Sequence, residues 1–70
     1  MKPIVYFDTW SKKFGPDGPE GNAFFIIGKV QKALKSDPER LQAFTEEATS
    51  GDYEHLLETV EKYCTIELNS

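Results

Sequence analysis

Three helix-start signals, at Asn22, Asp37 and Asp52, divide most of this chain into short segments and so limit the folds open to it. Each of these side chains is suited to accept a hydrogen bond from a free backbone N–H of a helical first turn. Pro38 strengthens the second signal, because proline fits the first turn, where its missing N–H does no harm. We expect Gly51 to end the second helix in the left-handed conformation that glycine adopts without strain. The pattern predicts three consecutive helices.

The apolar residues of each predicted helix fall on one face of a helical wheel. The three faces comprise Ala23, Ile26, Ile27, Val30, Ala33 and Leu34, then Leu41, Phe44 and Ala48, then Tyr53, Leu56, Leu57, Val60, Tyr63 and Cys64. The residues expected in water on the last helix are Glu54, His55, Glu58 and Lys62. Phe24, Phe25 and Gly28 lie outside the first face, so this helix carries more apolar surface than one core contact needs.

A strand is predicted at each end of the chain. The first is residues 2–10, a segment rich in β-branched and aromatic residues on both alternating sets, so we expect it to be covered on both faces. The second is residues 65–68, where Ile66 and Leu68 alternate with Glu67. Residues 11–21 hold two prolines and three glycines without an apolar period and read as a long loop. The order is β-α-α-α-β, a single α+β domain over residues 1–70 with a two-stranded sheet packed on three helices.

The short chain has few means of stabilising itself. A folded protein of this size hides only about 60% of the surface that its unfolded form exposes. Cys64 is the only cysteine and His55 the only histidine, so neither an internal disulfide nor a zinc site built from these two is expected. Nine of the 70 residues are aromatic. We therefore expect a homo-oligomer, in which a second copy covers part of the apolar surface.

Charge divides the chain into a basic and an acidic part. Residues 1–36 carry a net charge of +3 and residues 37–70 a net charge of −7. The acidic part would repel a nucleic-acid backbone, which disfavours direct nucleic-acid binding. The longest apolar run, residues 23–27, is too short to span a membrane, and the N-terminus lacks a signal-peptide pattern. The expectation is a cytoplasmic protein without membrane contact.

The glycine-rich loop that leads into Asn22 is the first candidate binding feature. It is too short for a collagen helix and matches neither the Walker loop nor the dinucleotide fingerprint. Its remaining interpretations are a plain turn, or a cradle in which Gly21 and the helix N-terminus present N–H groups to an anion. Lys12, Lys13, Lys29 and Lys32 then supply countercharge, unless they are only solvated surface residues.

The start of the last helix is the second candidate. Asp52 is either a structural cap or part of a site in which Ser50 and the amides near Gly51 hold a polar group while Tyr53 stacks on a flat ring. Trp10 is expected to stack similarly or to serve as a hydrophobic plug. The full set of expected ligand-binding residues is Trp10, Lys12, Lys13, Gly21, Asn22, Phe25, Lys29, Ser50, Gly51, Asp52 and Tyr53.

Catalysis is not expected. A nucleophile needs a base within hydrogen-bond reach and a third group to orient that base. Cys64 lies on the predicted core face while His55 points outward. Ser50 and His55 are close in sequence, but a lone exposed histidine next to three glutamates is more often a surface residue. Asp17 and Glu20 are too few for a calcium loop. We expect no catalytic residues, no metal and no cofactor.

The segments EGNAF, residues 20–24, and SGDYEHLL, residues 50–57, resemble small proteins encoded by tailed bacteriophages and bacterial mobile elements. The chain departs from that pattern in its longer loop before Gly18. The resemblance implies a phage genome and action in the host bacterial cytoplasm, but no agreed activity. By analogy with small viral proteins that serve anti-defence and immune evasion, we expect an oligomer that sequesters a phosphorylated nucleotide signal. The alternatives are an acidic inhibitor that docks onto a host defence protein, such as a CRISPR component or a nuclease, and a ligand-free accessory factor.

Overall fold

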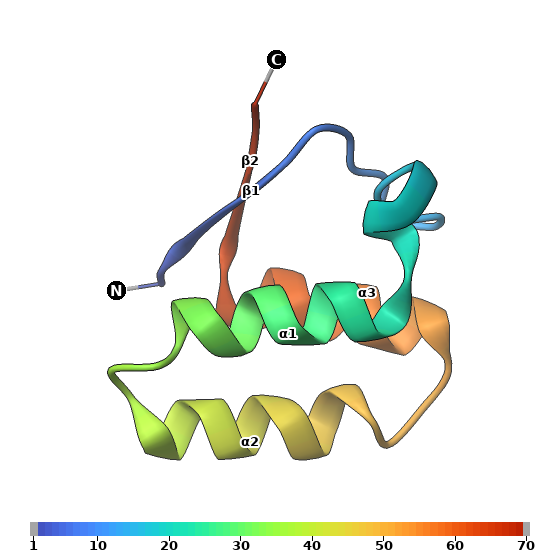
Figure 1. Cartoon of the computed structure of the whole chain (residues 1–70). Helices are drawn as coiled ribbons and strands as arrows, with labels where there is room; N and C mark the ends of the chain where they lie inside the picture. The colour runs from blue at the N-terminus through green and yellow to red at the C-terminus, as the bar shows by residue number, and fades with distance from the viewer. Residues whose placement is uncertain (1, 70) are drawn as a thin grey trace.

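The computed structural model describes residues 2–69 and has the predicted α+β architecture (Figure 1). The elements are β1 (Ile4–Phe7), the 3-10 helix η1 (Gly18–Gly21), α1 (Ala23–Ala33), α2 (Pro38–Ala48), α3 (Tyr53–Tyr63) and β2 (Thr65–Leu68). The order β-α-α-α-β is confirmed. One difference is η1, which turns the last part of the expected loop 11–21 into a single helical turn.

All three predicted N-caps are formed. The side chains of Asn22, Asp37 and Asp52 accept hydrogen bonds from the backbone N–H two, three and three residues later, at 2.8, 3.2 and 2.9 Å. Gly51 differs from expectation, because the glycines with positive φ in residues 2–69 are Gly15 and Gly18. The second helix therefore ends without a left-handed glycine, at Thr49 with φ −98°.

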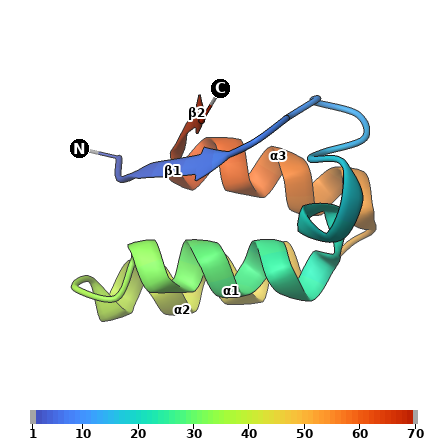
Figure 2. The same ribbon diagram turned by 45° about the horizontal axis from the view of Figure 1, so that its top comes forward.

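The two strands pair in parallel, in a register that sets Ile4 opposite Thr65. Both lie on the same side of the helices, and α2 packs beneath α1 and α3 on the side away from the strands (Figures 1 and 2). Val5 and Phe7 point toward the helices and are buried, whereas Ile4 and Tyr6 are 52% and 51% exposed. The expectation of a strand covered on both faces is wrong. Successive side chains of a strand point to opposite faces, and helices cover only one of them.

The core lies between the inner sheet face and the three helices. Its fully buried large residues include Phe7, Phe44, Ile26, Leu57, Val30 and Val60. Every residue placed on a predicted helix face is buried or half-buried. Thr59 is also buried, although it is polar, because its hydroxyl donates to the His55 carbonyl at 2.7 Å.

Candidate functional site

The starts of α1 and α3 meet at one end of the molecule, which brings several predicted site residues together. Tyr53 Oη donates a hydrogen bond to the Gly21 carbonyl at 2.5 Å, and burial raises the pKa of Tyr53. A hollow of about 290 Å³ lies beside this contact and includes Gly51 and Asp52. The Asn22 and Asp52 side chains are engaged as caps, and the Asp52 carboxylate is a poor neighbour for an anion. The meeting of the helix starts is thus mainly a structural joint.

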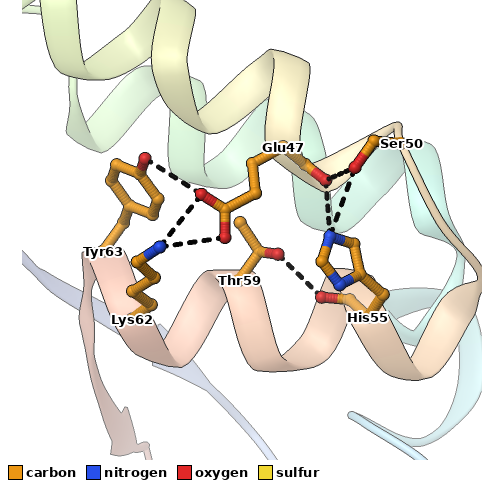
Figure 3. Close-up of polar contacts among 6 residues, drawn as sticks. All are labelled: Glu47, Ser50, His55, Thr59, Lys62 and Tyr63. Atoms are coloured by element: carbon orange, nitrogen blue, oxygen red, sulfur yellow. Dashed lines mark hydrogen bonds and ion pairs between the residues drawn. The ribbon is translucent and has the colours of Figure 1, made fainter.

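Ser50 and His55 both bond to a backbone carbonyl near the end of α2 and are not arranged as a nucleophile and its base (Figure 3). Ser50 Oγ donates to the Glu47 carbonyl at 2.8 Å, and His55 Nε2 lies 2.8 Å from the same oxygen and 3.3 Å from Ser50 Oγ. A carbonyl only accepts hydrogen bonds, so Nε2 carries its hydrogen in this arrangement and offers no lone pair to the serine. His55 is therefore half-buried and bonded, where the helical wheel predicts a residue in water.

Gly51 is explained by the same cluster. A Cβ at this position would lie 2.9 Å from the His55 Cβ and ring, closer than side-chain atoms approach. Residue 51 is therefore suited to glycine because there is no room for a side chain, and not because its backbone is left-handed. The Glu47 carboxylate adds a second link, because it binds Lys62 at 3.1 and 3.2 Å and accepts from Tyr63 Oη at 3.3 Å (Figure 3).

Lys29 and Phe25 lie on α1, where they form a cluster of their own. Lys29 Nζ is 3.5 Å from Glu20 Oε2, 4.4 Å from the centroid of the Phe7 ring and 5.6 Å from that of Phe25. The ammonium group therefore has a partner charge and two aromatic faces already. Lys13 lies in the loop, with Nζ 5.7 Å from the centroid of the neighbouring Phe14 ring.

A groove of about 430 Å³ runs beside β2 and contains Trp10 and Lys12. Its walls also include Lys2, Glu61, Cys64, Thr65, Ile66 and Leu68. The sequence around Trp10 and Lys12 does not predict that Lys2 is a neighbour. Lys2 lies in the same groove because the two strands pair in parallel. That pairing sets the start of β1 beside the start of β2, directly after the end of α3.

Trp10 is held in a fixed orientation at the wall of this groove. Its ring centroid lies 5.0 Å from that of Phe7 at an interplanar angle of 37°, and its Nε1–H donates to Glu61 Oε2 at 2.9 Å. Lys2 Nζ donates to the Glu61 backbone carbonyl at 3.1 Å. The groove has a net charge of +1, because two ammonium groups, those of Lys2 and Lys12, are balanced by only one carboxylate, that of Glu61. The groove thus combines an aromatic wall with two cationic side chains.

A metal-binding cluster and a membrane-spanning helix are both absent from residues 2–69. No three side chains among the histidine, the cysteine and the acids there gather in a way that suits a metal ion. Within the same range, every helix is too short or too polar to cross a bilayer. Comparison of the chain with protein-family models, with curated protein sequences and with solved structures finds no match.

Proposed function

We propose that this chain is a small non-enzymatic binding protein that holds a phosphorylated nucleotide in the groove beside β2. The observation that supports this function is the grouping of Trp10, Lys12 and Lys2 around one hollow. Its volume of about 430 Å³ lies within the range of small-molecule sites, roughly 300 to 1,000 Å³. A nucleotide matches this lining because it joins a flat ring to an anionic phosphate.

In the proposed complex the base stacks on the Trp10 indole while the phosphate contacts Lys2 and Lys12. Stacking of a base on an aromatic side chain contributes about 1–3 kcal/mol, and it tolerates any base. The single net positive charge of the groove favours a monophosphate or a cyclic phosphodiester over a triphosphate, whose extra charges would meet the Glu61 carboxylate. The proposed ligand class is therefore a nucleotide of low charge.

The biological role that we attach to this binding is sequestration of a nucleotide signal by a phage-encoded oligomer in a bacterial cytoplasm. The resemblance of the EGNAF and SGDYEHLL segments supports the phage setting. Exposed rings support the oligomer, since Phe24 and Phe14 are 85% and 70% exposed to solvent. Rings this exposed are commonly covered by a partner.

A second candidate is the acidic inhibitor, and the exposed acids of α3 favour it. Glu54 and Glu58 are exposed on this helix, whereas Glu61 is half-buried and bonded to Trp10. Charge reversal at Glu54 and Glu58 should then abolish recovery of one host protein from lysate by the tagged chain. Recovery that survives this double change would exclude the acidic face as the docking surface.

The nucleotide site is tested by intrinsic fluorescence, because Trp10 is the only tryptophan. Titration with AMP, cyclic AMP, a cyclic dinucleotide, ADP-ribose and ATP should give saturable quenching with at least one of the less charged compounds. The same compound at 100 times its dissociation constant should stabilise the fold by about 2.7 kcal/mol in a thermal-shift assay. Inorganic phosphate is the control ligand, because it lacks the nucleotide base that would stack on Trp10.

Lys12→Ala and Lys13→Ala form a matched pair of variants, since both change an exposed loop lysine but only Lys12 lines the groove. We expect Lys12→Ala to weaken the quenching by about tenfold and Lys13→Ala to leave it unchanged. Absence of both quenching and thermal shift with every compound would overturn the proposed function. Equal loss in the two variants would place the ligand outside the groove.

A further inference from the structure

The outer edge of β1 is the edge turned away from β2, its partner in the sheet. Phe7 and Pro3 direct their carbonyls toward β2, where they accept from the N–H groups of Asn69 and Thr65, both at 2.9 Å. Backbone polar groups alternate sides along a strand, so those of Ile4 and Tyr6 point away from β2. Within residues 2–69 no other strand pairs with this edge. The edge is therefore open to a further strand.

A groove of about 250 Å³ lies along this open edge, between β1 and α1. The strand contributes Ile4, Val5 and Tyr6 to it, and the helix contributes Lys29, Lys32 and Ala33. An extended chain placed here would bond to the free groups of Ile4 and Tyr6. Its side chains on one face would rest on Ala33 and the lysine stems, and those on the other face would lie beside the exposed Ile4 and Tyr6 side chains.

The charges around this groove select its occupant. Lys29 is paired with Glu20, but Lys32 is exposed and forms no ion pair with any residue that the structure describes. A second copy that paired its own β1 edge here across a two-fold axis would bring the same lysines together, which is unfavourable. An acidic strand instead gives Lys32 a countercharge.

The outer face of the sheet, in contrast to the α1 side, does not favour acidic side chains. Glu67 stands opposite Tyr6 in the sheet, so a carboxylate already lies on that face near the exposed Ile4 and Tyr6 side chains. A bound strand is therefore best matched when its acidic residues face α1 and its apolar residues face outward. We propose that the β1 edge binds an extended segment of a partner protein, with alternating acidic and apolar residues, as a third strand.

Fluorescence anisotropy with a labelled peptide of alternating glutamate and valine, of strand length, tests this inference. Its saturable binding should be at least about tenfold tighter than that of the matching lysine–valine peptide. Lys32→Glu should weaken glutamate–valine binding by about tenfold, whereas Lys35→Glu, an exposed lysine outside the groove, should leave it unchanged. Circular dichroism confirms that both variants remain folded.

Two further forms of the peptide test strand addition itself, each N-methylated on one alternating set of amides. A strand uses the amides of only one edge to bond to β1, so one form should lose binding and the other retain it. Equal binding of the two forms would overturn the inference, as would equal effects of Lys32→Glu and Lys35→Glu. The nucleotide groove lies beside β2, so Lys12→Ala should leave peptide binding unchanged.

Discussion

Tyr53 Oη donates a hydrogen bond of 2.5 Å to the carbonyl of Gly21, which lies 32 residues earlier in the chain. This contact joins the end of η1 to the first turn of α3. Two segments that each look like an ordinary helix start are thereby fixed to one another. The joint also fixes the long loop, because Gly15 lies directly against the Tyr53 hydroxyl.

Tyr53→Phe should lower the free energy of unfolding by about 1 kcal/mol, because it removes this hydrogen bond and leaves the Gly21 carbonyl without its partner. Urea denaturation measures the change. Tyr63→Phe is the control, since the longer 3.3 Å contact of Tyr63 with Glu47 is backed by Lys62 on the same carboxylate. Equal losses in the two variants would contradict a special role for the joint.

Gly15→Ala and Gly28→Ala should change stability in opposite directions. Gly15 has φ +71°, and a Cβ there would lie 2.8 Å from Tyr53 Oη and 2.9 Å from Leu57 Cδ2. We expect a loss of at least about 1–2 kcal/mol, from the left-handed backbone and the clash. A Cβ on Gly28 meets nothing within 4 Å, so alanine in this helix should add about 0.5–1 kcal/mol. Thermal unfolding measures both, and a destabilised Gly28→Ala protein would contradict the open surface seen at that position.

Cys64 should make stability depend on pH in the alkaline range. Burial raises the pKa of its thiol from 9.0 to about 11. Above pH 9 the unfolded chain loses a proton that the folded chain keeps, so the free energy of unfolding falls as pH rises toward 11 and is unaffected by this group below pH 9. Urea midpoints across this range should fall more steeply for the wild-type protein than for Cys64→Ala. Parallel curves for the two proteins would show that the thiol does not contribute.

Phe24→Asp should reduce the proposed oligomer to single chains if the exposed rings of α1 form the contact between copies. Phe24 is 85% exposed, so the change removes no internal packing and should leave the fold intact. Light scattering after size exclusion gives the mass, and Gln42→Asp, on the exposed side of α2, is the charge-matched control. A wild-type protein that already has the mass of one chain at micromolar concentration would refute the proposed oligomer.

The helices were predictable because their signals are local. The caps Asn22, Asp37 and Asp52 each accept a hydrogen bond from an N–H no more than three residues later. The spacing of apolar residues along each helix likewise predicts its buried face. The role of Gly51 is different from the predicted one because the constraint on this residue is not local. The need for a glycine arises from the His55 ring, whose position depends on the Glu47 carbonyl and not on the backbone preference of residue 51.

The groove beside β2 is predictable from the sequence only in part. Trp10 and Lys12 are expected binding residues, but the expected site combines them with the helix starts, which line a different hollow. Lys2 and Glu61 complete the groove, and each comes from a different part of the chain. No spacing rule relates residues 2, 10 and 61, so only the parallel pairing of the strands reveals their proximity.

Local signals in the sequence predict the three α-helices, their starts, their buried faces and a strand near each end, because capping hydrogen bonds and apolar periodicity act over a few residues. The tertiary structure alone decided that the strands run parallel, that the Ile4 and Tyr6 face is bare, and that Trp10 lies between Phe7 and Glu61. These features depend on contacts between residues that are distant in the chain. Such contacts form, and contribute to the free energy of folding, only when all the elements pack together.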